Sequence, residues 1–233
     1  MEIKKTLVAT CTRKAKFADT TLHDSIWKHE LLCRTILNNE ESLAKRYNEI
    51  IDEAVEDNVD CLILVHDDVI LEEDPIPKLE RLFDDYDLVG VAGTSKVELK
   101  SPALWHLMGG GFRGGNLHGC VQHLSEEIIS YMPLLKRELK PESNFGPYPH
   151  RVVMIDGVFM ALNRKMLESG VRFDEDCPSK FHMYDLLLSL NAHLAGLKVG
   201  VGDILITHES PGLREYTDVW RSGEQYFLNK YGK

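Results

Sequence analysis

Several features that would reveal a protein class at once are missing from this 233-residue sequence. No apolar run approaches the length of a membrane span without charged residues, and the run that follows Met1 is too short for a signal peptide. The five cysteines are scattered, odd in number and never in Cys-x-x-Cys spacing, which argues against a disulfide framework or a structural zinc site. We therefore expect a cytoplasmic protein with reduced thiols and no transmembrane segment.

Positive charge is also in short supply. The 27 lysines and arginines face 37 aspartates and glutamates, which gives a formal net charge of −10. This balance argues against broad electrostatic binding to nucleic acid, although it is compatible with a local basic groove. The sequence has no repeat and no low-complexity tract, and its 43% hydrophobic content is ordinary for a folded domain. These numbers leave the oligomeric state open.

Apolar runs of strand length alternate with helical patterns in the first part of the chain. Cys61 to Val65 is apolar on both faces, as in a strand at the middle of a parallel sheet covered by helices. Further strands are expected at Lys5 to Thr10 and Asp87 to Gly93. Three helices are expected: one around Ser25 to Leu37, one that is capped by Asn38 or Asn39 and ends near Asp57, and one over Pro75 to Phe83. The alternation predicts an α/β fold that binds ligands beyond the carboxyl ends of its strands.

The second part starts with a loosely patterned region, residues 94–151. It is too long for a simple connection, so we expect it to be functional or a small subdomain. From here on we expect strands at Trp105 to Phe112, His118 to His123, Val152 to Leu162 and Lys198 to Thr207, a loop at Pro141 to Pro149, and helices near Lys165, from Phe181 to Leu197 and from Thr217 to Lys230.

The triplet His66-Asp67-Asp68 leaves a buried strand at its carboxyl end. Three such side chains can hold a hard divalent cation, which in turn can hold a diphosphate. The same triplet can also be a polar turn whose aspartates cap the next segment, because short acidic motifs are common. Its position after a central strand favours the functional interpretation.

The helix expected from Phe181 has an apolar stripe and an opposite polar side. The polar side carries His182, Asp185, Ser189 and His193. Asp185 could project into a cleft and act as a general base. It could equally belong to a solvated face on which its charge is favourable toward the helix dipole.

Two further positions can carry chemistry. His208 ends a strand-like run, and imidazole binds manganese, zinc or iron well, although a lone histidine at a strand end is more often only exposed. Asp156-Gly157 interrupts an apolar strand, where a buried aspartate needs a partner, either a ligand or a backbone amide.

The order of these motifs resembles that of family 2 inverting glycosyltransferases, in particular the subgroup named for a streptomycin-biosynthesis protein. The resemblance runs from the first strand to about Ser210. Its residues are Tyr47-Asn48, Leu62 to Val69, Met154 to Arg164, Arg172 to Glu175, Phe181 to Asp185 and Gly196 to Ser210.

The resemblance implies a GT-A type nucleotide-diphospho-sugar transferase fold over one domain, residues 1–233. It divides the chain into a nucleotide-binding half (1–93), a variable acceptor-side region (94–151), a catalytic half (152–210) and a C-terminal helix (211–233). The implied partners are a nucleotide-sugar donor, a hydroxyl acceptor and Mn²⁺ or Mg²⁺. The implied roles are donor binding by Thr10, Cys11, Thr12, Asp67, Asp68, Asp156 and Gly157, metal binding by Asp68 and His208, and proton removal from the acceptor by Asp185.

Two departures from the family pattern are visible. His66 occupies the first position of the usual Asp-x-Asp motif, and the first strand lacks the ending Pro-Thr-Tyr-Asn, so the base specificity is open. Acceptor contacts are expected from Trp105, Arg113, His182 and Tyr184, although aromatic residues are more often part of the core.

Two other classes remain as alternatives. A metal-dependent phosphohydrolase or nucleotidyltransferase could use the same acidic turn, and a GT-A scaffold could bind a sugar nucleotide without turnover. The presence of both Asp185 and His208 speaks against the inactive scaffold. The acceptor is expected to be a glycan, a lipid-linked sugar or a small metabolite, with a modified DNA base as a less favoured option.

Overall fold

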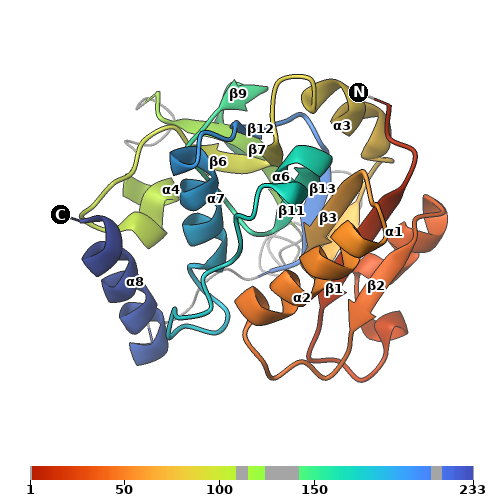
Figure 1. Cartoon of the computed structure of the whole chain (residues 1–233), viewed down its shortest axis with the longest axis horizontal. Helices are drawn as coiled ribbons and strands as arrows, with labels where there is room; N and C mark the ends of the chain where they lie inside the picture. The colour runs from red at the N-terminus through yellow and green to blue at the C-terminus, as the bar shows by residue number, and fades with distance from the viewer. Residues whose placement is uncertain (1, 109–114, 124–141, 211–216, 233) are drawn as a thin grey trace, which may run out of the picture.

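Two β-sheets form the framework of the molecule (Figure 1). This computed structural model describes residues 2–108, 115–123, 142–210 and 217–232. Among those residues, no helix combines the length and the apolar character needed to span a bilayer.

The larger sheet has a mainly parallel arrangement. Its strands follow the order β2 (Cys33–Ile36), β1 (Thr6–Cys11), β3 (Cys61–Val65), β11 (Phe159–Asn163), β5 (Leu88–Gly90), β12 (Val199–Val201) and β9 (His150–Arg151). Only β11 and β9 run against the common direction. Every residue of β3 and β11 is buried, because helices or the second sheet cover both faces of this sheet. The predicted α/β class with a mainly parallel central sheet is confirmed.

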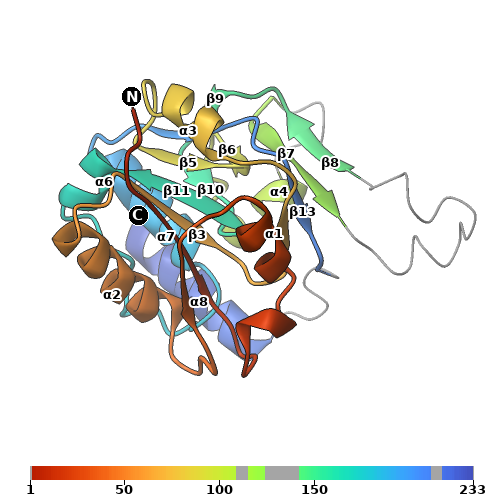
Figure 2. The ribbon, with the colours of Figure 1, turned by 90° about the vertical axis from the view of Figure 1, so that its right-hand side faces the viewer.

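The smaller sheet lies beside the larger one. Its order is β10 (Met154–Ile155), β6 (Ala92–Thr94), β7 (Leu117–His123), β13 (Ile206–His208) and β4 (Val69–Leu71), and β8 (Glu142–Gly146) pairs with β7. Figure 2 shows β7 and β8 extending away from the body of the molecule. The antiparallel pairing of β13 with β4 sets His208 opposite Val69, directly after the polar triplet.

The chain passes between the two sheets several times in its described part. Four of these crossings are short connections that matter for the site or for the predicted strands: His66–Asp68, Val91, Asp156–Val158 and residues 202–205. The continuous strands predicted over 87–93, 152–162 and 198–207 are therefore wrong, since each is two short strands on different sheets. Both halves of each run are buried, so the apolar pattern alone does not reveal the crossing. Two of these short connections, His66–Asp68 and Asp156–Val158, carry the polar residues that the sequence singled out.

Helices cover the sheets on both sides. The structure has α1 (Leu22–Lys28), α2 (Leu43–Glu56), α3 (Ile76–Leu82), α4 (Trp105–Met108), α6 (Arg164–Glu168), α7 (Tyr184–Leu194) and α8 (Asp218–Tyr231), with short 3-10 turns at Phe17–Asp19 and Pro102–Leu104. One apolar cluster joins α2, α6 and α7 to one face of the larger sheet. A second cluster joins the other face to α1, α3 and the smaller sheet, and also holds the far side of α7 against α8. Helix α7 is thus buried along most of its length.

Several local predictions are corrected by the structure. The cap of α2 is Ser42, whose hydroxyl accepts from the Lys45 amide, and not Asn38 or Asn39. The helix expected over 25–37 ends at Lys28, because Cys33–Ile36 pairs in parallel with β1.

Two further corrections concern the region 94–151. The strand expected from Trp105 begins as helix α4, and its last residues lie outside the described part of the chain. The loop expected at 141–149 contains strand β8, which pairs antiparallel with β7 through a register shift next to Gly119.

Candidate active site

The polar turn after β3 is fixed by its own backbone. The His66 amide donates to the Val158 carbonyl, and the carbonyls of Asp67 and Asp68 accept from the amides of Leu22 and Glu209 at 3.2 and 2.8 Å. The turn is therefore tied to the connection Asp156–Val158, to α1 and to the end of β13. This anchoring leaves the three side chains free to point into a common space.

A cavity of about 330 Å³ opens beside this turn. It lies at the carboxyl ends of β1 and β3, where an α/β sheet is expected to bind its ligand. The lining residues are Cys11, Thr12, Arg13, Lys14, Asn39, Leu43, Tyr47, His66, Asp67, Asp68 and Phe181. This volume lies at the lower end of the range typical of small-molecule sites.

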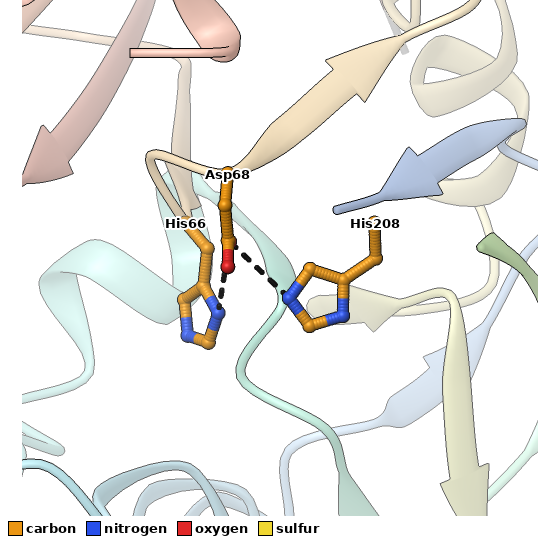
Figure 3. A group of neighbouring side chains, drawn as sticks. All are labelled: His66, Asp68 and His208. Atoms are coloured by element: carbon orange, nitrogen blue, oxygen red, sulfur yellow. Dashed lines mark ion pairs between the residues drawn. The ribbon is translucent and has the colours of Figure 1, made fainter. Parts of the chain in front are cut away.

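Three potential metal ligands converge at one side of the turn (Figure 3). Asp68 Oδ1 lies 3.2 Å from His208 Nε2 and 3.9 Å from His66 Nδ1, and the three ligand atoms all lie within 4.8 Å of one another. Two ligand atoms that each lie about 2.1 Å from one ion are at most about 4.2 Å apart. Both distances from Asp68 fall below this limit, and the two histidine nitrogens, which lie within 4.8 Å of each other, must come within it for all three atoms to share one cation.

The burial of these atoms supports a cation rather than a purely structural role. Asp68 Oδ1 and His208 Nε2 are both buried, and apart from their own ion pair at 3.2 Å neither has a partner among the residues that the structure describes. A buried polar atom without a partner is costly, so it indicates a missing ligand or ion. The donor set of two imidazoles and a carboxylate suits a divalent cation. The residues present therefore fit the metal that the sequence predicted.

Electrostatic interactions hold this cluster in mixed charge states. Burial raises the pKa of Asp68, but its pairing with His208 and the charge of His66 outweigh burial and leave the pKa below its usual value. Burial lowers the pKa of His208, but the nearby Asp68 carboxylate outweighs burial and raises it overall. Burial lowers the pKa of His66, which favours its neutral form.

The residues predicted at the end of β1 lie in two different environments. Cys11 and Thr12 line the cavity, and the Thr12 hydroxyl donates to Asp67 Oδ2 at 2.5 Å. Thr10 is completely buried inside the sheet and does not line the cavity. Asp67 thus faces the end of the first strand, while Asp68 faces His208.

Asp185 lies at the start of α7 and is held against the connection Asp156–Val158 between β10 and β11. Its Oδ2 accepts from the Gly157 amide at 2.7 Å, and one turn later Ser189 Oγ accepts from the Ile155 amide at 3.2 Å. Ser189 is completely buried, so this part of the helix is not a solvated face. Burial raises the pKa of Asp185, and the nearby Asp156 carboxylate raises it further, to about 7. A carboxylate with such a pKa suits proton removal at neutral pH.

Asp156 connects the two groups of polar residues. Its Oδ1 accepts from the Val158 amide at 2.9 Å, which holds the side chain in the turn between β10 and β11. Its charge acts on Asp185 on one side and on His66 and His208 on the other. We refer to Asp156 and Asp185 as the carboxylate pair, and to His66, Asp68 and His208 as the ligand cluster.

The residues predicted for the acceptor side are not gathered in one place. Trp105 is 3% exposed and packs against Phe145 in the core. Tyr184 is also buried, and its hydroxyl lies 2.7 Å from His66 Nε2, so it contacts the ligand cluster. His182 is partly exposed, and Arg113 lies outside the described residues.

Sequence reasoning assigned no role to several residues that line the cavity. The Arg13 guanidinium lies 4.4 Å from the centre of the Phe181 ring, and Lys14 follows it along the cavity wall. They place positive charge beside a cavity in an otherwise acidic chain. The signal available in the sequence was the basic pair directly after the first strand.

The chain is similar to one known family and to several solved structures. The Glycosyltransferase like family matches residues 28–231. Among solved structures, the crystal structure of A197 from STIV has a TM-score of 0.49 at 12% identity, over 92% of this chain and 98% of that chain. A glycosyltransferase involved in the glycosylation of the major capsid of PBCV-1 has a TM-score of 0.40 at 12% identity, over 96% of this chain and all of that chain.

No curated protein matches the chain. The family match spans most of the sequence, including every strand of the two sheets except β1, and it includes the ligand cluster and the carboxylate pair. Together with the mixed α/β sheet flanked by helices, it is consistent with the GT-A-like fold that the sequence predicted.

Proposed function

This chain belongs to the Glycosyltransferase like family, and we propose that it is a metal-dependent, inverting enzyme of family 2 that transfers a sugar from a nucleotide-sugar donor to an acceptor hydroxyl. The observation that carries the proposal is the convergence of the ligand cluster and the carboxylate pair. Tyr184 reaches His66 at 2.7 Å while its neighbour Asp185 receives the Gly157 amide. In this proposal a diphosphate-binding group and a general base are therefore adjacent.

In this proposal the donor lies along the cavity. Cys11 and Thr12 at the end of β1, with Asp67, contact the nucleoside, and the basic side chains Arg13 and Lys14 are available to its phosphates. Asp68 and His208 would hold Mn²⁺ or Mg²⁺, which would neutralise the charge that develops on the departing diphosphate. Asp156 and Gly157, which do not line the cavity but lie next to the ligand cluster, would contact the transferred sugar. Thr10 supports this wall from inside the sheet.

Asp185 acts as the general base. It removes the proton from the acceptor hydroxyl, and the oxygen forms a bond to the anomeric carbon as the bond to the diphosphate breaks. Attack from the face opposite the diphosphate inverts the anomeric configuration. The raised pKa supports this role, because a base with a pKa near the working pH is both ionised and basic enough.

The acceptor is proposed to be the hydroxyl of a glycan, a lipid-linked sugar or a small metabolite. His182 is the predicted acceptor-side residue that is partly exposed and directly precedes α7. The subgroup named for a streptomycin-biosynthesis protein, the choice between hexosyl and pentosyl transfer, and a cytoplasmic location remain predictions.

The test is a product assay with a panel of sugar nucleotides, with and without Mn²⁺. We expect release of the nucleoside diphosphate, stimulated by the metal and by the right acceptor. Release of free phosphate would identify a hydrolase, and formation of pyrophosphate a nucleotidyltransferase. Binding without any product from every donor and acceptor class would indicate an inactive scaffold. Each of these three outcomes contradicts glycosyl transfer.

A further inference from the structure

The first ligand position of the acidic turn is a histidine, and its environment gives it a definite orientation. His66 Nε2 lies 2.7 Å from the Tyr184 hydroxyl, while Nδ1 is the nitrogen that faces Asp68, at 3.9 Å. When Nε2–H donates to the tyrosine oxygen, the lone pair of Nδ1 points toward Asp68. Histidine ligands of metals commonly donate one ring N–H to a neighbouring group, and this hydrogen bond orients the other ring nitrogen toward the metal.

The tyrosine is well placed to hold this orientation. Tyr184 is 4% exposed and packs edge-on against Tyr47, with ring centroids 5.8 Å apart. Its hydroxyl is also close to the backbone of Gly157, where a Cβ would come within 2.3 Å of it. The tyrosine therefore has little room to move, and His66 is held by a rigid partner.

We infer that His66 is a third ligand, through Nδ1, and that the site selects a transition-metal ion that binds imidazole, such as Mn²⁺, Co²⁺ or Zn²⁺, over Mg²⁺. The inference rests on the proposed metal site at Asp68 and His208 and deepens it. Mg²⁺ is bound chiefly by oxygen ligands, and this cluster supplies one carboxylate and two imidazoles. Among the three ions, affinity should increase from Mn²⁺ to Co²⁺, with Zn²⁺ also above Mn²⁺.

Asp67 does not change this ligand set. Its Oδ2 accepts from the Thr12 hydroxyl at 2.5 Å, on the side of the turn that faces the first strand. Asp68 supplies the carboxylate oxygen that lies within 4.8 Å of both histidine nitrogens, and Asp156 acts on the two histidines through its charge while its Oδ1 accepts from the Val158 amide. The selectivity therefore depends on the two histidines.

The experiment titrates the purified full chain with Mg²⁺, Mn²⁺, Co²⁺ and Zn²⁺ separately, without nucleotide, and follows thermal stability and calorimetric binding. We expect Mn²⁺, Co²⁺ and Zn²⁺ to bind at least about tenfold more tightly than Mg²⁺. Pulsed electron paramagnetic resonance of the Mn²⁺-loaded protein should detect nitrogen from two imidazoles. Equal affinity for Mg²⁺ and Mn²⁺, or nitrogen from fewer than two imidazoles, would overturn the inference.

Variants separate His66 from other histidines. His66→Gln should lose one nitrogen signal and weaken Mn²⁺ and Co²⁺ binding about tenfold or more, and His66→Asp should raise the affinity for Mg²⁺ relative to Mn²⁺. The control is His150→Gln, which changes an exposed histidine stacked on His118 at 3.6 Å and should leave binding unchanged. A loss of binding in His150→Gln but not in His66→Gln would show that the ion binds near His150 and His118, and would overturn the inference.

The proposed function can fail independently of this inference. Selective Mn²⁺ binding without nucleoside diphosphate release from any donor would contradict sugar transfer and leave the ligand assignment intact. Sugar transfer with equal binding of Mg²⁺ and Mn²⁺ would contradict the ligand assignment and leave the proposed function intact. The metal titrations and the electron paramagnetic resonance measurement use the wild-type protein, so the inference can be tested even if a variant fails to fold.

Discussion

The ligand cluster and the carboxylate pair lie side by side but satisfy their polar atoms in different ways. In the carboxylate pair, a backbone amide donates to one oxygen of each side chain: Gly157 to Asp185 and Val158 to Asp156. In the ligand cluster, Asp68 Oδ1 and His208 Nε2 are buried and, in the described residues, have only each other as partners. One group is complete as folded, and the other is arranged for something that the polypeptide does not supply.

The difference separates positioning from binding. Amide donors hold Asp185 in one orientation, while burial and Asp156 keep it basic, so the carboxylate pair is preorganised for proton transfer. Asp68 and the two histidines gain their partner only when an ion arrives. Loss of a residue from either group should therefore have a different signature.

The most severe test of this comparison replaces one carboxylate in each group. We expect Asp185→Asn to lower kcat by about 10²–10⁴-fold, as for loss of a general base, while Mn²⁺-dependent nucleotide binding is retained. Asp68→Asn should instead abolish metal-dependent nucleotide binding. Steady-state kinetics and calorimetric titration with nucleoside diphosphates provide the two readouts. Wild-type turnover in Asp185→Asn would show that the base is misassigned, and unchanged Mn²⁺ binding in Asp68→Asn would do the same for the metal site.

The pH dependence of stability and activity sharpens the comparison on the carboxylate side. The folded-state pKa of Asp185, about 7, lies above the value of an unfolded aspartate, about 3.9. The protonated form is therefore favoured by folding, and this contribution to stability is lost as the pH rises through 7. Activity should change in the opposite direction, since the base must be ionised, with kcat/KM falling about tenfold per pH unit below 7.

Asp185→Asn is the matching variant for this pH effect. It should raise the melting temperature relative to wild type more at pH 8 than at pH 5, because the penalty for ionising the carboxylate grows between the unfolded pKa of about 3.9 and the folded pKa of about 7. Thermal unfolding at several pH values without added metal measures this. The same temperature difference at both pH values would contradict a raised pKa.

Gly157→Ala should have a smaller effect on activity and stability than the carboxylate replacements or the change of pH. The added Cβ would lie 2.3 Å from the Tyr184 hydroxyl and 3.0 Å from the Asp185 Cβ, so both side chains must shift. We expect a loss of about 1–3 kcal/mol in stability, as for overpacking, together with lower kcat. The matched control is Gly170→Ala, at φ 78° with nothing within 4 Å, which should lose stability without changing kcat. Equal kcat losses in both would mean that Gly157 has no special role.

The main layers of the fold could be predicted from the sequence because a fully buried strand is visible as a short run of apolar residues. Cys61–Val65 is apolar at every position and lies in the middle of the sheet as expected. The sheet crossings were missed because burial continues on both sides of Val91 and of residues 202–205. Cys33–Ile36 was predicted as helix, since its strand state depends on pairing with β1, which is a contact with distant residues.

The site was predicted in part for a similar reason. Asp68, His208 and Asp185 could be named from their order along the chain, and the structure brings Asp68 and His208 to 3.2 Å. Trp105 could not be placed, because an aromatic residue looks the same in a core and in a pocket. The stacking of Arg13 on Phe181 joins residues that are far apart in sequence, so no local pattern records it.

The pairing of β13 with β4 has a consequence for the chain as a whole. It joins an early turn to a strand near the end of the described residues through three residue pairs, Ile206 with Leu71 to His208 with Val69. An ion shared by His66, Asp68 and His208 would cross-link these segments and close a loop that contains most of the domain. Because such a site rarely exists in the unfolded chain, the binding free energy of the ion would add to the stability of the folded state and fasten the last strand of the smaller sheet to the first half of the protein.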